Sequence, residues 1–260
     1  MKNDHYTSRL QKGGALLNEM RQLTTMWTDD PRTAEEIIAN NPLASPSRNR
    51  LNDVLVRTFI PRFVKGNPEN LWRVLAILEQ GSVNASTIRA MHYFAAANSD
   101  LLLNEFTIEW LYEQYLSQRL QVDTDDVKSF LQARPVQKFG SKRWSESVQT
   151  KVARGLLAAL RDFGILEGRS KKSIAPVDFR LEACALIAFI LHGRFRGGEQ
   201  VLAAIEWKLY MQSRADIEKA FLEAHARKYL NYQAAGNTIS IFFPADTLED
   251  YARVIIQRTN

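Results

Sequence analysis

The stretch WSESVQTKVARGLLAALRDFGILEGRSKKSIAPVDFR, residues 144–180, carries the strongest structural pattern of the chain. Successive residues of a helix are separated by about 100° around its axis. In residues 144–163 this angle places Lys151, Arg154 and Arg161 on one arc and a set of apolar side chains on the opposite arc. The apolar set is Val148, Val152, Leu156, Leu160 and Phe163. The pattern predicts an amphipathic helix with a buried stripe and a basic outer face.

A basic, hairpin-like segment follows this helix. Gly164 and Gly168 bracket a short turn, and Arg169, Lys171 and Lys172 come before the chain becomes apolar again. A helix with exposed cations followed by a basic hairpin is typical of a winged helix-turn-helix that contacts the DNA backbone. An ordinary solvated helix with a charged loop accounts for the same residues, so DNA binding is at this point a hypothesis.

The net charge of +5 is unevenly distributed along the chain. Residues 134–180 have 11 basic and 4 acidic side chains, a net charge of +7, whereas residues 99–133 have 2 and 7, a net charge of −5. Residues 1–98 have a net charge of +3, and residues 181–260 have none. Phosphate backbones attract a basic segment of this kind. The alternative is that the two central segments neutralise each other in the fold.

Helical spacing recurs along most of the 260 residues and predicts a mainly α protein, a multi-helix globular fold with helix-turn-helix or winged-helix-like elements. Residues 101–120 form one expected helix, and Asp123 is expected to cap a short helix that ends near Leu131. Pro61 should end the helix that begins near Leu51. The expected layout is an N-terminal helical bundle, residues 1–121, and a C-terminal helical region, residues 122–260. One continuous globular unit is the alternative.

The clearest β pattern lies near the C-terminus. Apolar residues alternate on both sides of the turn sequence Ala235-Gly236-Asn237, from Leu230 to Phe243. This predicts one short β-hairpin. With the helix expected after Ser213, residues 213–244 would form a second helix-hairpin unit beside the winged-helix-like segment of residues 144–180. Its neutral charge makes it the weaker candidate for DNA.

Motifs of catalysis are missing from the sequence. It has no phosphate-binding loop, no Gly-x-Ser-x-Gly elbow and no His-Glu-x-x-His pair. The single cysteine, Cys184, lies in an apolar run of nine residues, 183–191. We therefore expect no enzyme activity, no catalytic residues, no metal site and no cofactor. That run is shorter than the roughly 20 residues of a membrane span. Since the first eleven residues are polar, a cytoplasmic protein is expected.

The candidate DNA-binding residues come from residues 142–172. Cations are assigned to phosphate contact, and Ser147 and Gln149, near the start of the helix, to reading base edges. The proposed phosphate contacts are Lys142, Arg143, Lys151, Arg154, Arg161, Arg169, Lys171 and Lys172. Basic residues of the N-terminal half extend this surface only if the fold places them beside Lys151 and Arg154. They are Arg48, Arg50, Arg57, Arg62 and Lys65.

Three sequence blocks resemble the BrxA family, a small helical component of bacterial BREX phage-exclusion systems. They are GALLNE at residues 14–19, FTIEWL at 106–111, and KVAR at 151–154 followed by DFGIL at 162–166. The resemblance implies a bacterial defence system that methylates host DNA and blocks phage replication. It also implies an all-helical, DNA-associated accessory factor, with methyltransferase and ATPase activities in its partner proteins.

Three functions therefore follow as hypotheses. The first is a non-enzymatic accessory protein that binds double-stranded DNA. The second is a protein-interaction scaffold of the same complex, whose basic patch docks on an acidic partner. The third is a winged-helix transcription regulator, which would form a dimer and bind one operator tightly.

Overall fold

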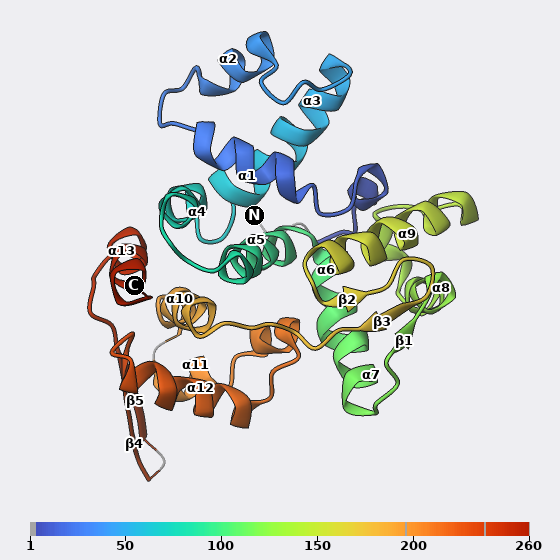
Figure 1. Cartoon of the computed structure of the whole chain (residues 1–260). Coiled ribbons are helices and arrows are strands. Elements are labelled where there is room, and N and C mark those ends of the chain that lie inside the picture. Colours follow the sequence, from blue (N-terminus) through green and yellow to red (C-terminus); the bar gives the residue numbers. More distant parts are fainter. Residues whose placement is uncertain (1–3, 196, 237, 260) are drawn as a thin grey trace.

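Helices make up most of the computed structural model, which describes residues 4–195, 197–236 and 238–259 (Figure 1). The mainly α fold class is confirmed, with a few short antiparallel strands. Within the described residues, no helix is both long and apolar enough to cross a membrane.

The N-terminal part of the chain ends in one largely buried helix. That helix, α5, lies in the middle of the molecule, and its buried residues include Met91, Tyr93 and Phe94 (Figure 1). The elements of this part, in chain order, are η1 (Ser8–Lys12), α1 (Leu17–Met26), α2 (Thr33–Asn40), α3 (Arg48–Val54), η2 (Leu55–Val64), α4 (Leu71–Gln80) and α5 (Ala85–Ser99).

The helix that begins with α3 does not end at Pro61, so that prediction is wrong. It continues as η2 to Val64 in wider turns, closed for example by the Lys65 amide donating to the Ile60 carbonyl at 2.8 Å. Proline has no N–H, so in these wider turns the carbonyl five residues earlier, that of Val56, receives no amide from Pro61. Arg9 of η1 donates to the neighbouring Arg57 carbonyl at 3.0 Å, which joins η1 to this helix.

The central part combines helices with a small sheet. Its elements are α6 (Leu101–Glu105), η3 (Phe106–Leu111), α7 (Tyr112–Leu116), β1 (Gln121–Val122), α8 (Thr124–Gln132), η4 (Val136–Phe139), α9 (Glu146–Asp162), β2 (Leu166–Glu167) and β3 (Lys172–Ile174). The strands lie in the order β1-β3-β2, and both pairs are antiparallel. β1 spans the expected boundary between residues 121 and 122.

Two details of this part were predicted with different success. Asp123 caps α8 as expected, because its carboxylate accepts from the amides of Asp125 and Asp126. The helix expected over residues 101–120 ends at Leu116, since Gln118 adopts a left-handed conformation with φ of 58°. The residues after it form β1, which the sequence did not predict.

The C-terminal part returns to the N-terminal half. Its elements are α10 (Leu181–His192), α11 (Gly198–Leu202), η5 (Ile205–Tyr210), α12 (Arg214–Ala226), β4 (Asn231–Ala235), β5 (Thr238–Phe242) and α13 (Leu248–Thr259). β4 and β5 form the predicted hairpin, with Tyr232 opposite Ile241, while the predicted turn residue Asn237 lies outside the described residues. α13 packs against α4, so apolar side chains from all three parts share one core.

Candidate nucleic-acid interface

The candidate surface is built on α9, whose two faces differ as the sequence predicts. The hydroxyl of Ser145 caps the helix by accepting from the Val148 amide at 3.4 Å. Val152, Leu156 and Leu160 are fully buried. The residues exposed on the opposite face are Ser147, Lys151, Arg154 and Arg161. Burial of the apolar stripe therefore fixes which side chains face solvent.

The exposed cations of α9 differ in whether protein groups already neutralise them. Among the described residues, neither Lys151 nor Arg154 makes a hydrogen bond or ion pair through its charged group. Arg161, by contrast, is paired with Asp162 at 2.8 Å. Lys151 and Arg154 are thus the α9 cations that are free to contact an external anion.

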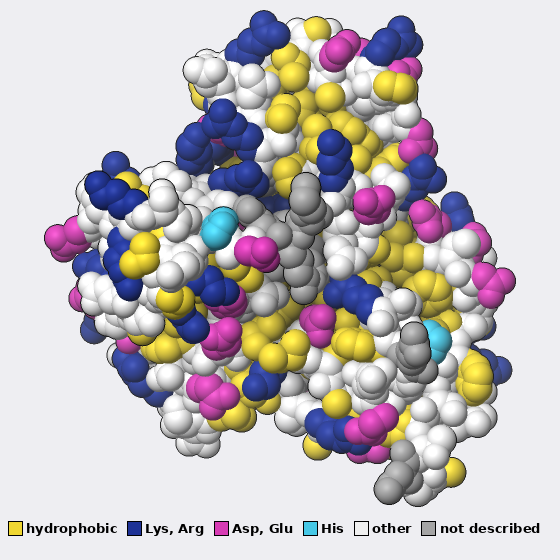
Figure 2. All heavy atoms as spheres, turned by 180° about the vertical axis from the view of Figure 1, so that it is seen from behind, with side chains coloured by type: hydrophobic (Ala, Val, Ile, Leu, Met, Phe, Trp, Pro, Cys, Tyr) yellow, Lys and Arg dark blue, Asp and Glu magenta, His cyan; other side chains and the backbone are white. Residues whose placement is uncertain are grey.

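The β2–β3 hairpin places further cations just after α9. Gly168 has φ of +85°, and a Cβ there would lie 2.1 Å from the Lys171 carbonyl oxygen, so this tight turn requires glycine. Arg169 and Lys171 are exposed near the turn, while the Lys172 ammonium donates to the Arg169 carbonyl at 3.0 Å. Figure 2, seen from behind, shows many Lys and Arg side chains over the lobe formed by α7–α9 and β1–β3.

Two further candidate residues, besides Arg161 and Lys172, have internal partners. Arg143 donates to the carbonyls of Leu131 and Arg134 at the end of α8, and its guanidinium lies 5.3 Å from the ring centre of Phe139. Gln149 donates through its amide to the Trp144 carbonyl at 2.8 Å. The structure therefore gives Arg143 and Gln149 roles in holding the segment before α9. Lys142 and Ser147 are exposed.

The rear of α9 rests on the N-terminal segment. η1 crosses the helix at Gly155, where an added Cβ would lie 2.0 Å from the Leu10 carbonyl oxygen. No sequence pattern predicted this contact, although a glycine in the middle of an amphipathic helix often marks a close approach of backbones.

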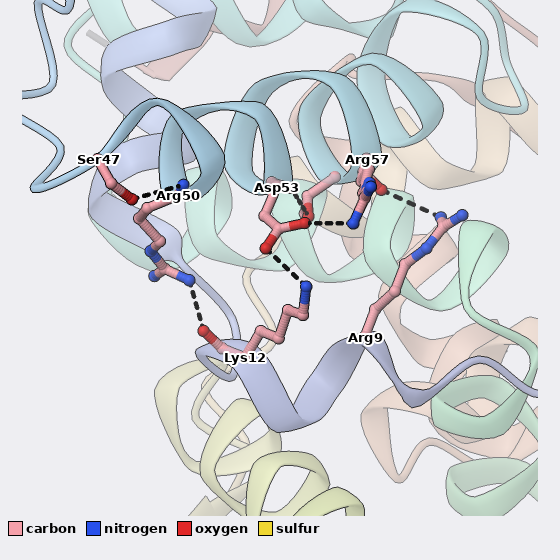
Figure 3. Close-up of polar contacts among 7 residues, drawn as sticks. Arg9, Lys12, Ser47, Arg50, Asp53 and Arg57 are labelled. Carbon is pink, nitrogen blue, oxygen red and sulfur yellow. Dashed lines mark hydrogen bonds and ion pairs between the residues drawn. The ribbon is translucent and has the colours of Figure 1, made fainter.

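On its other side, η1 contacts cations of the N-terminal helices. Arg50 donates to the Lys12 carbonyl at the end of η1, and Arg57 shares the carboxylate of Asp53 with Lys12 (Figure 3). Arg62 is instead buried, so it is not part of an exposed basic track. Arg48 and Lys65 are exposed.

The residues considered for other chemistry are located in the core. Cys184 is buried, and burial raises the pKa of its thiol. His92 is also buried, and burial lowers the pKa of its ring. In the part of the chain that the structure describes, no three His, Cys, Asp or Glu side chains are grouped as metal ligands.

Comparison with known proteins gives a family and a fold. The family model of BrxA matches residues 4–189. A crystal structure of an uncharacterized protein from Magnetospirillum magneticum is similar, with a TM-score of 0.54 at 16% sequence identity. The alignment covers 80% of this chain and all of that one. At this identity the likeness concerns the fold alone. No curated protein sequence matches the chain.

Proposed function

The chain belongs to the BrxA family, a component of BREX phage-defence systems, and from this premise we propose that it binds double-stranded DNA as a non-enzymatic accessory protein. The observation that carries the proposal is the pair Lys151 and Arg154. These cations lie on the solvent face of α9, and no anion of the described residues neutralises them. Phosphate oxygens of a DNA backbone would complete their interactions and release counterions.

The arrangement around α9 supports the same proposal. The elements run helix, strand, helix, helix and hairpin from α6 to β3, and β1 joins the hairpin as a third strand. This is the order of a winged helix, in which the last helix enters the major groove and the hairpin contacts the backbone. From Lys151 to Arg161 the cations extend over about 15 Å of helix, at 1.5 Å per residue.

The proposed roles of individual residues follow from their partners. Lys151 and Arg154 contact phosphate from α9, and Arg169 and Lys171 from the hairpin, with Lys142 beside the start of α9. Ser147 is the remaining candidate for a base edge, because Gln149 already donates to Trp144. Arg161 and Lys172 add positive charge to the surface, but Arg161 is already paired with Asp162 and Lys172 already donates to the Arg169 carbonyl.

A protein-interaction scaffold is the second candidate, and a specific observation favours it. Apolar side chains are exposed on the same lobe, with Leu116 at 55% and Leu120 at 44% exposure. Such side chains, on a lobe that also has exposed cations, suit a partner that offers both apolar and acidic groups. Within a BREX complex, the methyltransferase and ATPase components are the partners to test, and we propose that the protein meets them in the cytoplasm without a cofactor.

The deciding experiment is a fluorescence-anisotropy titration of labelled duplex DNA at two salt concentrations, beside single-stranded DNA and RNA of the same sequence. We expect duplex binding that weakens steeply with salt and depends little on sequence. Tight, salt-tolerant binding to a single operator would instead indicate a transcription regulator. Failure to bind duplex at low salt would overturn the proposal, and pull-down of the BREX partners would then test the scaffold.

A further inference from the structure

A second basic feature lies on η1, on the side that faces α3 and η2. A cavity of about 300 Å³ opens there, and charged residues of three elements surround it (Figure 3). The residues that matter are Arg9 and Lys12 from η1, Arg50 and Asp53 from α3, and Arg57 from η2. We call this cavity the η1 pocket.

Internal contacts hold these side chains in place. Asp53 accepts from Lys12 at 2.7 Å and from Arg57 at 2.9 Å. Arg9 donates to the carbonyl of Arg57, and Arg50 donates to the carbonyl of Lys12. Each arginine has five N–H donors, so these contacts leave most of the donors unused. The cations are therefore oriented before any ligand arrives, which lowers the entropic cost of binding one.

The charges of the η1 pocket do not balance. Four cations surround the ionised Asp53, because hydrogen bonding from Lys12 holds the pKa of that carboxyl below its ordinary value. A second acid near these cations is Glu19, whose carboxylate lies 3.9 Å from the Arg50 guanidinium. Counting both acids leaves a net charge of +2 at neutral pH. The buried pair Arg62 and Asp100, in a neighbouring cavity, adds no net charge.

We propose that the η1 pocket binds a dianionic phosphate group, either free or at the end of a nucleotide or DNA strand. Its charge complements the excess of +2, and its tetrahedral oxygens can accept from several donors at once. The guanidinium groups of Arg9, Arg50 and Arg57 have the fork geometry that suits phosphate. A carboxylate or a backbone phosphodiester carries only one negative charge and would leave the pocket positive.

The site is separate from the α9 surface and does not depend on it. η1 lies between the two, with Leu10 against α9 and Arg9 and Lys12 directed toward α3 and η2 (Figure 3). Substitutions in the η1 pocket and on α9 can therefore be tested independently, so failure of one proposal is distinguishable from failure of the other.

The first test measures stabilisation by inorganic phosphate, using thermal unfolding against chloride at matched ionic strength. A ligand that binds only the folded protein raises the unfolding temperature, and the stabilisation grows with the logarithm of the ligand concentration divided by Kd. We expect phosphate to stabilise the wild-type protein and to bind the variant Arg9→Gln/Arg57→Gln at least about tenfold more weakly. Lys12→Gln is a second, milder variant, for use if the double variant unfolds without ligand.

Two controls separate the pocket from general charge. Arg253→Gln removes an exposed cation that is paired with Asp250 on α13, and it should leave phosphate binding unchanged. Arg227→Gln removes a second exposed cation, paired with Glu223 at the end of α12, and should also leave it unchanged. If either control lost as much phosphate binding as Arg9→Gln/Arg57→Gln, phosphate would be screening surface charge in general. This result would overturn the proposal.

A second set of titrations identifies the source of the phosphate. Adenosine monophosphate is compared with adenosine, and a duplex with 5′-phosphates with the same duplex ending in 5′-hydroxyls. Tighter binding of adenosine monophosphate than of adenosine, without a difference between the duplexes, identifies a free nucleotide as the ligand. Tighter binding of the phosphorylated duplex identifies a DNA end. In both cases Arg9→Gln/Arg57→Gln must abolish the difference. Either result supports the pocket. No preference in either comparison, with no stabilisation by inorganic phosphate, would reject it.

Discussion

The carbonyl oxygen of Leu10 lies directly over the α-carbon of Gly155, so that a Cβ on Gly155 would be 2.0 Å from it. This contact joins η1 to the rear of α9 and fixes the helix that carries Lys151 and Arg154. Since both atoms belong to backbones, neither can move aside by a side-chain rotation. Packing of the N-terminal segment on the rear of α9, together with burial of the helix's own apolar stripe, therefore determines which face of α9 is exposed.

Gly155→Ala should therefore destabilise the protein, although alanine favours helices. Alanine adds about 1 kcal/mol of helix propensity, whereas overpacking of this kind costs about 1–3 kcal/mol. We expect the immobile Leu10 carbonyl to place the change at the upper end, with a net loss of about 1–2 kcal/mol in urea unfolding. Gly193→Ala is the matched control, because a Cβ there meets nothing closer than 3.5 Å. Equal stability of the two variants would contradict the close contact.

Lys151→Ala/Arg154→Ala should weaken duplex binding to a similar extent on all sequences. Each lost phosphate contact removes about 0.9 from the slope of log K against log salt, so the double variant should lose nearly 2. Anisotropy titrations over a series of salt concentrations measure both quantities. Unchanged affinity and slope in a folded variant would exclude this face of α9 as the DNA contact.

Arg169→Ala/Lys171→Ala tests the hairpin separately from the helix. Both side chains are exposed near the Gly168 turn, so their removal should not change the unfolding temperature. We expect a smaller salt slope and weaker binding, as for the α9 pair, because these cations would contact backbone phosphates. The same titration checks this, and a normal slope would restrict the interface to α9.

Arg143→Ala should behave differently from both pairs. Its guanidinium donates to the carbonyls of Leu131 and Arg134, so its loss leaves the end of α8 without these donors. The expected result is a decrease of about 1 kcal/mol in the free energy of unfolding, with a smaller change in DNA affinity than for Lys151→Ala/Arg154→Ala. Unfolding curves and titrations of the same sample compare the two effects. A loss of DNA affinity without any loss of stability would instead indicate that Arg143 contacts DNA.

Acid stability should depend on Glu79, which links α4 to α1. Burial alone would raise the pKa of Glu79. The nearby His92 and two hydrogen bonds from the Arg21 guanidinium outweigh this effect and lower the pKa to about 2. A carboxyl with a lowered pKa stabilises the folded state above its unfolded pKa, near 4.3, and this stability is lost as the pH falls toward 2. Arg21→Met should raise the pKa of Glu79 and move acid unfolding to a higher pH.

Circular dichroism between pH 2 and pH 7 measures that shift. Because Arg21 is 43% exposed, solvent screening should limit the shift to a few tenths of a pH unit. Arg73→Met is the control, since Arg73 pairs with Asp29, which is largely exposed. An equal shift in both variants would assign the effect to net charge and not to Glu79.

Periodicity predicted the faces of α9 correctly because burial of an apolar stripe is a local property of a helix. The roles of Arg143 and Gln149 could not be predicted in this way, since they depend on which carbonyls remain free nearby. Pro61 was expected to end a helix, but the wider turns of η2, such as the one closed by the Lys65 amide on the Ile60 carbonyl, carry the helix past it. β1 has two residues and acquires its structure from β3, so no pattern within it could indicate a strand.

The pairing of β1 with β3 also sets the order in which this lobe can be assembled. Glu167 and Ser173 of β2 and β3 pair across a short turn, but Val122 pairs with Lys172, which follows it by 50 residues. At translation rates of about 5–20 residues per second, β1 leaves the ribosome several seconds before its partner strand. Closing so long a loop costs more chain entropy than closing the β2–β3 turn, and earlier docking of α8 against α9 would reduce that cost. The three-stranded sheet is therefore completed late, and a nascent chain exposes the edge of β1 until β3 has been synthesised.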